Sequence, residues 1–144
     1  MRQTLKNVIR KTIAPMTEGI VLVDTFQGGE PTLRGIEFFQ KAVAYQKQYN
    51  KNHVQVHNSL QTNGLAVNEE WCEFFKENNF LIGLSVDGTE ETHNSLRHTK
   101  SGEDTFSRIY ESAKLMDKYQ VEYNILTVVN EKYCRKYQGY LYVI

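Results

Sequence analysis

The stretch Val21-Leu22-Val23-Asp24-Thr25-Phe26-Gln27-Gly28-Gly29-Glu30-Pro31-Thr32 decides the fold class of this chain. Its first half is an apolar, β-branched run that predicts a strand, and a Gly-Gly turn follows at once. Because Pro31 disfavours helical geometry in the residue before it, we expect the Glu30 carboxylate to stand on the turn. A strand that ends in bare backbone and an acidic side chain is typical of the ligand-binding edge of α/β enzymes. The glutamate makes this edge poor for phosphate and suits it to a ligand that carries an ammonium group.

The rest of the chain repeats this alternation of strands and helices. Helical spacing predicts helices over 3–13 and 32–49, a third helix with Asn68 as N-cap, and a fourth with Asp104 as N-cap. Strands are expected over 19–26, 53–62, 80–86 and 121–129, and less regular segments are a turn of helix at 89–93, a loop at 98–103 and a short strand at 140–144. The order predicts an open parallel sheet of about four strands with flanking helices. The apolar strands predict that both faces of the sheet are covered.

Length and composition place the chain in a broad class. With 144 residues it is expected to form one domain, 1–144, or part of one. The formal net charge of zero gives no electrostatic reason to expect a nucleic acid or an anionic membrane as partner. There is no long apolar run or signal-peptide pattern. Two distant cysteines, Cys72 and Cys134, fit a reducing compartment, so we expect a cytoplasmic protein.

Polar or small residues follow each of the first three predicted strands. After Gly-Gly-Glu come Asn63-Gly64 behind the second strand, and Ser85 with Asp87-Gly88 at the end of the third. In a parallel α/β sheet these ends share one edge, so together they favour a ligand site. The alternative is that Asn-Gly and Asp-Gly are ordinary turns.

These stretches carry a family resemblance. Residues 26–32, 58–64 and 83–88, extended by 104–107 and 121–126, resemble radical S-adenosylmethionine (SAM) enzymes, in particular anaerobic sulfatase-maturating enzymes. The resemblance runs from about residue 3 to residue 130 and implies a partial (β/α) barrel that binds SAM across its strand ends. It implies that Gly28, Gly29 and Glu30 hold the methionyl ammonium, and that Ser85 and Arg97 hold the methionyl carboxylate. For Arg97, a solvated loop arginine is the alternative.

The resemblance also implies a reaction. Asn63 would lie near the ribose hydroxyls, and Gln27 would face the substrate. In a complete family member, an electron from a [4Fe–4S] cluster cleaves SAM, and the resulting radical abstracts hydrogen from a cysteine or serine of a sulfatase, which becomes formylglycine. A peptide or sulfatase is therefore the implied substrate. No residue of this chain is assigned a catalytic role.

The chain departs from the family pattern at the cluster. The C-x-x-x-C-x-x-C loop that provides three thiolates is absent. Cys72 is interpreted as a core residue, and the four histidines have no metal-ligand spacing. We therefore expect an internal piece of a longer enzyme, without a stable cluster of its own and without the family's C-terminal domain.

Two alternatives stay open: a catalytically silent, truncated or partner-binding chain, and a piece of another radical SAM enzyme that modifies peptides. In each case we expect unpaired strand edges to promote self-association.

Overall fold

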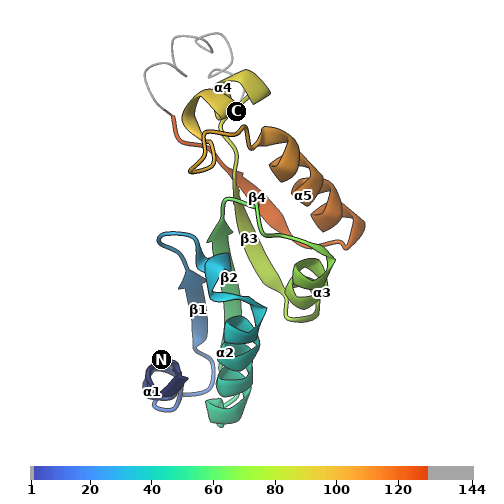
Figure 1. Cartoon of the computed structure of the whole chain (residues 1–144). Helices are drawn as coiled ribbons and strands as arrows, with labels where there is room; N and C mark the ends of the chain where they lie inside the picture. Colours follow the sequence, from blue (N-terminus) through green and yellow to red (C-terminus); the bar gives the residue numbers. More distant parts are fainter. Residues whose placement is uncertain (1, 130–144) are drawn as a thin grey trace.

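The computed structural model describes residues 2–129 and has one parallel sheet (Figure 1). Its four strands lie in the order of the chain, β1-β2-β3-β4, and every neighbouring pair is parallel. The strands are β1 (Val21–Phe26), β2 (Gln55–Thr62), β3 (Phe80–Ser85) and β4 (Tyr123–Leu126). The predicted open α/β architecture is thus confirmed, and the carboxyl ends of all four strands point to the same edge.

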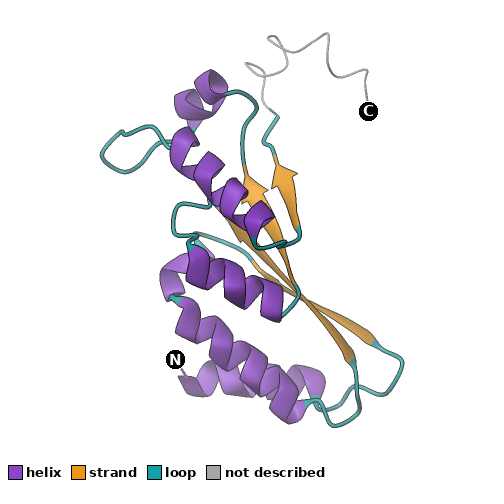
Figure 2. Cartoon of the chain, turned by 90° about the vertical axis from the view of Figure 1, so that its right-hand side faces the viewer, coloured by secondary structure: helices purple, strands orange, loops and turns teal. Residues whose placement is uncertain are grey.

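The helices connect the strands and lie on one side of the sheet (Figure 2). They are α1 (Arg2–Ile13), the 3-10 turn η1 (Pro31–Arg34), α2 (Ile36–Tyr49), α3 (Glu69–Glu77), α4 (Glu90–Leu96) and α5 (Phe106–Lys118). The expectation of two covered faces is wrong for the described residues, because burial alternates along each of the first three strands. The uncovered face carries side chains such as Val23, Ser59 and Gln61, a mixture that tolerates water.

The main core lies between the sheet and helices α2, α3 and α5. Phe39 from α2, Phe75 from α3 and Phe80 from β3 are among its fully buried side chains. Trp71 lies edge-on to Phe39, with ring centroids 5.4 Å apart, so aromatic packing joins α2 to α3. A second cluster, from α1 and α2, extends the core under β1 and includes Ile13. These contacts fix the sheet, and with it the edge that carries the polar residues.

Several predicted element boundaries differ from the structure. The strands expected over 19–26 and 121–129 are shorter and span Val21–Phe26 and Tyr123–Leu126. Two further differences have a cause in the backbone. The helix expected over 32–49 is divided, because Gly35 adopts φ 75° between η1 and α2, a conformation that only glycine takes at little cost. The strand expected from residue 53 begins at Gln55, since His53 has φ 52° and leaves the extended region.

The N-cap predicted for α5 is also wrong. The helix begins at Phe106 rather than directly after Asp104. The cap comes from the side chain of Asn94, which belongs to α4. Its Oδ1 accepts hydrogen bonds from the backbone N–H groups of Thr105 (3.2 Å) and Phe106 (3.0 Å). The predicted Asn68 cap of α3 is confirmed, because its side chain accepts from Trp71 N at 3.0 Å. The strand expected at 140–144 and Cys134 lie outside the described residues.

Candidate functional site at the carboxyl edge of the sheet

Glu30 connects the ends of the first two strands. It stands on the turn after β1 with extended backbone, φ −125° and ψ 104°, as the following proline predicts. Its Oε1 accepts from the Thr32 backbone N–H (3.1 Å) and hydroxyl (2.6 Å) and from the Thr62 hydroxyl (2.8 Å). Its Oε2 accepts from the Asn63 N–H at 2.8 Å, and this is its only bond to the described residues. A carboxylate oxygen has room for a second donor, so Oε2 remains available to a ligand cation.

The two glycines before Glu30 leave the edge open. Gly28 has φ 98° and Gly29 φ 59°, and a Cβ atom added to either would meet no atom within 4 Å. A cavity of about 500 Å³ lies against this turn. Its lining comes from the end of β1, the turn, η1 and the start of α2, and includes Gln27, Gly28, Gly29 and Glu30. Its size is in the range of small-molecule sites.

Asn63, Ser85 and Arg97 lie outside this cavity, although two of them are on the same edge. Asn63 follows β2, and its Oδ1 accepts from Leu65 N at 3.0 Å, which is an ordinary Asx turn. Its Nδ2 group makes no hydrogen bond to the described residues and is available to a ligand. Ser85 is the last residue of β3, half-buried and paired in register with Leu126 of β4. Its hydroxyl makes no hydrogen bond to the described residues.

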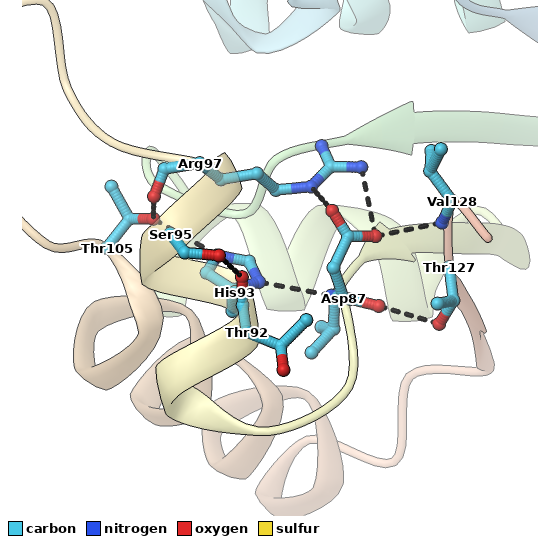
Figure 3. Close-up of polar contacts among 9 residues, drawn as sticks. Asp87, Thr92, His93, Ser95, Arg97, Thr105, Thr127 and Val128 are labelled. Carbon is cyan, nitrogen blue, oxygen red and sulfur yellow. Dashed lines mark hydrogen bonds and ion pairs between the residues drawn. The ribbon is translucent and has the colours of Figure 1, made fainter. Parts of the chain in front are cut away.

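Asp87 is a residue of this edge whose specific role the sequence analysis missed. Its carboxylate binds Arg97, with Asp87 Oδ2 2.5 Å from Arg97 Nε and Oδ1 3.4 Å from Nη2 (Figure 3). Burial alone would raise the pKa of Asp87, but hydrogen bonds from Arg97 and the Val128 N–H hold it below the ordinary value. The arginine is thus paired rather than merely solvated. An Asp-Gly turn and an arginine ten residues later form no known motif, so the sequence contained no usable signal for the pair.

The described residues do not provide an iron–sulfur site. Cys72 is completely buried in α3, which confirms its prediction as a core residue. Burial, with the nearby carboxylates of Glu69 and Glu73, raises the pKa of its thiol to about 11, so it is poorly suited to act as a thiolate ligand. Within residues 2–129, no group of three His, Cys, Asp or Glu side chains is placed to hold a metal ion.

Among those same residues, no helix combines the length and apolar character needed to cross a bilayer.

Known proteins have sequences similar to most of this chain. A cysteine-type anaerobic sulfatase-maturating enzyme of Clostridium novyi (strain NT) is 49% identical over 110 residues, which cover 76% of this chain and 29% of that protein. A serine-type anaerobic sulfatase-maturating enzyme of Bacteroides thetaiotaomicron is 41% identical over 107 residues, covering 74% of this chain and 26% of that protein. The chain therefore spans less than a third of the length of these relatives.

Solved structures agree with the sequence comparison. The structure of native anSMEcpe with bound AdoMet and Cp18Cys peptide has a TM-score of 0.90 and 41% sequence identity, and the match covers 94% of this chain and 37% of that chain. Native anSMEcpe with bound AdoMet has a TM-score of 0.92 over 99% of this chain. The family model described as the Radical SAM superfamily matches residues 3–134. The resemblance inferred from the motifs is thereby confirmed, and the chain belongs to the radical SAM superfamily.

Proposed function

We propose that residues 1–144 are part of the core domain of a radical SAM enzyme that matures sulfatases, and that they position SAM at the carboxyl edge of the sheet. The observation that carries the proposal is the turn of Gly28, Gly29 and Glu30, with its open backbone and its partly available carboxylate. When bound, SAM supplies the hydrogen-abstracting chemistry. The complete protein would convert a cysteine or serine of a sulfatase to formylglycine.

In this proposal the turn binds the methionyl ammonium. The backbone carbonyls of Gly28 and Gly29 and the Glu30 Oε2 atom are its acceptors. Glu30 Oε1 is saturated by Thr32 and Thr62, so these two residues hold the carboxylate in place while Oε2 contacts the ligand. A fixed anion facing a cation gives a charge-assisted hydrogen bond, which is stronger than a neutral one.

The other end of the amino-acid group would be held from β3 and α4. The Ser85 hydroxyl donates to the methionyl carboxylate, and the Arg97 guanidinium supplies the opposite charge. The Asn63 Nδ2 group contacts the ribose hydroxyls, while its Oδ1 accepts from Leu65 N in the turn. Gln27, exposed at the cavity, faces the substrate side.

The residues present do not fit a [4Fe–4S] cluster. The whole chain has two cysteines, and the family loop needs three thiolates. The same observation favours a second candidate function, binding of SAM or of a partner without radical chemistry. Iron and sulfide analysis after anaerobic reconstitution tests the absence of a cluster, because about four irons per chain would show that this chain holds one and would rule out the second candidate.

Calorimetric titration of the chain with SAM tests the binding proposal. We expect the substitution Glu30→Gln, which keeps the shape and removes the charge, to weaken binding by about 1–3 kcal/mol. Glu18→Gln is the matched control, because Glu18 is exposed and precedes β1, at the opposite edge of the sheet. Equal affinity of the wild type and the Glu30 variant would remove Glu30 from the site, and a thermal unfolding curve shows whether the variant is folded.

A further inference from the structure

Asp87 is a buried carboxylate whose hydrogen bonds join three segments of the chain. It lies two residues after the end of β3, and its side chain is 3% exposed. Arg97, after α4, donates from Nε and Nη2, and the Val128 N–H, after β4, donates to Oδ1 at 2.8 Å (Figure 3). The Thr127 hydroxyl also donates to the Val86 carbonyl at 2.7 Å, which fastens the chain after β4 to the end of β3. Asp87 therefore sets the position of the guanidinium relative to the strand ends.

The backbone on both sides of this ion pair is also fixed. The Asp87 N–H donates to His93 Nδ1 at 3.1 Å, so Nδ1 carries no proton and Nε2 carries it. His93 Nε2 then donates to Thr105 Oγ1 (3.1 Å), and the Thr105 hydroxyl donates to the Arg97 carbonyl (3.0 Å). This chain of bonds holds the backbone of Arg97 while Asp87 holds its side chain. Arg97 is thus anchored at both ends.

This arrangement leaves one edge of the guanidinium for a ligand. Nε and Nη2 are occupied by Asp87, whereas Nη1 makes no hydrogen bond to the described residues. The Arg97 side chain is 30% exposed, so this edge is accessible to solvent. An arginine fork with one edge held by a buried carboxylate is prepared to bind a second carboxylate in a single orientation.

We propose that Asp87 is a positioning residue, which acts on the methionyl carboxylate only through Arg97. The inference rests on the proposed function, because it takes Arg97 as a contact of SAM. A negative charge beside Arg97 weakens the net attraction for an anion, so electrostatics alone predicts tighter binding when Asp87 is neutralised. Positioning predicts the reverse, because a released arginine side chain must be ordered again at each binding event.

Titration of the 144-residue chain with SAM and with decarboxylated SAM tests the proposal. The second ligand keeps the ammonium, the sulfonium and the adenosine and lacks only the carboxylate. We expect the wild type to prefer SAM and Asp87→Ala to lose about tenfold in SAM affinity, the size of one charge-assisted hydrogen bond. Affinity for decarboxylated SAM should change less than about twofold. The control Glu111→Ala breaks an exposed ion pair with Lys114 and should affect neither ligand.

A double-mutant cycle shows whether Asp87 acts through the arginine. In the Arg97→Ala background, Asp87→Ala should cause no further loss of SAM affinity. Asp87→Asn keeps an oxygen that accepts from the Val128 N–H, so it is the variant to use if Asp87→Ala does not fold, and we expect an intermediate loss for it. Equal losses for both ligands, additive losses in the cycle, or tighter SAM binding by Asp87→Asn would overturn the positioning role.

The same titrations separate this inference from the proposed function. A wild type that binds SAM and decarboxylated SAM equally well overturns the roles of Arg97 and Asp87, while SAM binding itself stands. A wild type that binds neither ligand overturns the proposed function, and the role of Asp87 falls with it.

Discussion

At the scale of single residues, burial sets which groups can carry charge. His93 is completely buried between Asp87 and Thr105, and burial, followed by the nearby positive charge of Arg97, lowers its pKa below 6.5. The imidazole is therefore neutral at pH 7, in agreement with its acceptor role toward the Asp87 N–H. Two motif residues, Glu30 and Asn63, also belong to the framework, because the side chain of each closes a local turn.

Stability should fall as the pH drops below about 6.5 because of His93. The unfolded chain takes up the proton near the ordinary pKa of 6.5, whereas the folded chain resists it until the pH is lower. At pH values between 6.5 and the lower pKa of the folded state, the unfolded state binds more protons. The free energy of unfolding therefore falls by up to about 1.4 kcal/mol for each pH unit. Chemical denaturation between pH 5 and 8 measures this, with His93→Gln as a variant that does not titrate. Parallel pH curves for wild type and variant would contradict the assignment.

At the scale of elements, polar side chains decide where helices begin, and the one that caps α5 comes from another helix. The α5 helix has no side-chain cap of its own, and Asn94, on α4, bonds its first N–H groups instead. The turn η1 is capped by Glu30, so the start of this turn and the proposed ligand site share a single carboxylate. Gly64 shows how closely the turn after β2 approaches β3, because a Cβ atom added there would lie 2.6 Å from Leu84 Cδ1.

Removing the Asn94 side chain, which caps α5, should destabilise the chain more than removing the Asp104 side chain just before that helix. We expect Asn94→Ala to cost about 1 kcal/mol of unfolding free energy, since two partly buried N–H groups lose their acceptor. Asp104→Ala is the matched control, because the Asp104 side chain is exposed and caps nothing. Urea denaturation gives both values. A larger loss for Asp104→Ala would show that the sequence-based cap was right after all.

At the scale of the whole molecule, the described residues cover one face of the sheet and leave the other face exposed. Val21 is 54% exposed and Val23 61% on the outer strand β1, and Leu81 of β3 is 41% exposed on the same face. β1 and β4 each have one neighbour in the sheet formed by residues 2–129. Apolar side chains beside unpaired strand edges favour pairing with other chains.

We therefore expect the 144-residue chain to bind hydrophobic dyes and to self-associate as its concentration rises. Val23→Lys places a charge on the exposed edge strand and should reduce both effects without loss of core packing. Val8→Lys, at a 57% exposed position on α1, is the matched control away from the sheet. Light scattering at several concentrations measures the association. A monodisperse wild type without dye binding would mean that the uncovered face is stable in water by itself.

The sequence by itself determined the alternation of elements, the parallel sheet, the Asn68 cap and the family, because each follows from short contiguous patterns or from their order along the chain. Apolar periodicity predicts a strand or helix locally, and the Gly-Gly-Glu turn is contiguous. Only the tertiary structure decided the Asp87–Arg97–Val128 connection and the Asn94 cap. These contacts join residues separated by ten to forty-one positions, at distances that exist only after the strands have paired and the helices have packed. No local preference of an aspartate or asparagine specifies such a partner, so the structure alone shows that Asp87 pairs with Arg97.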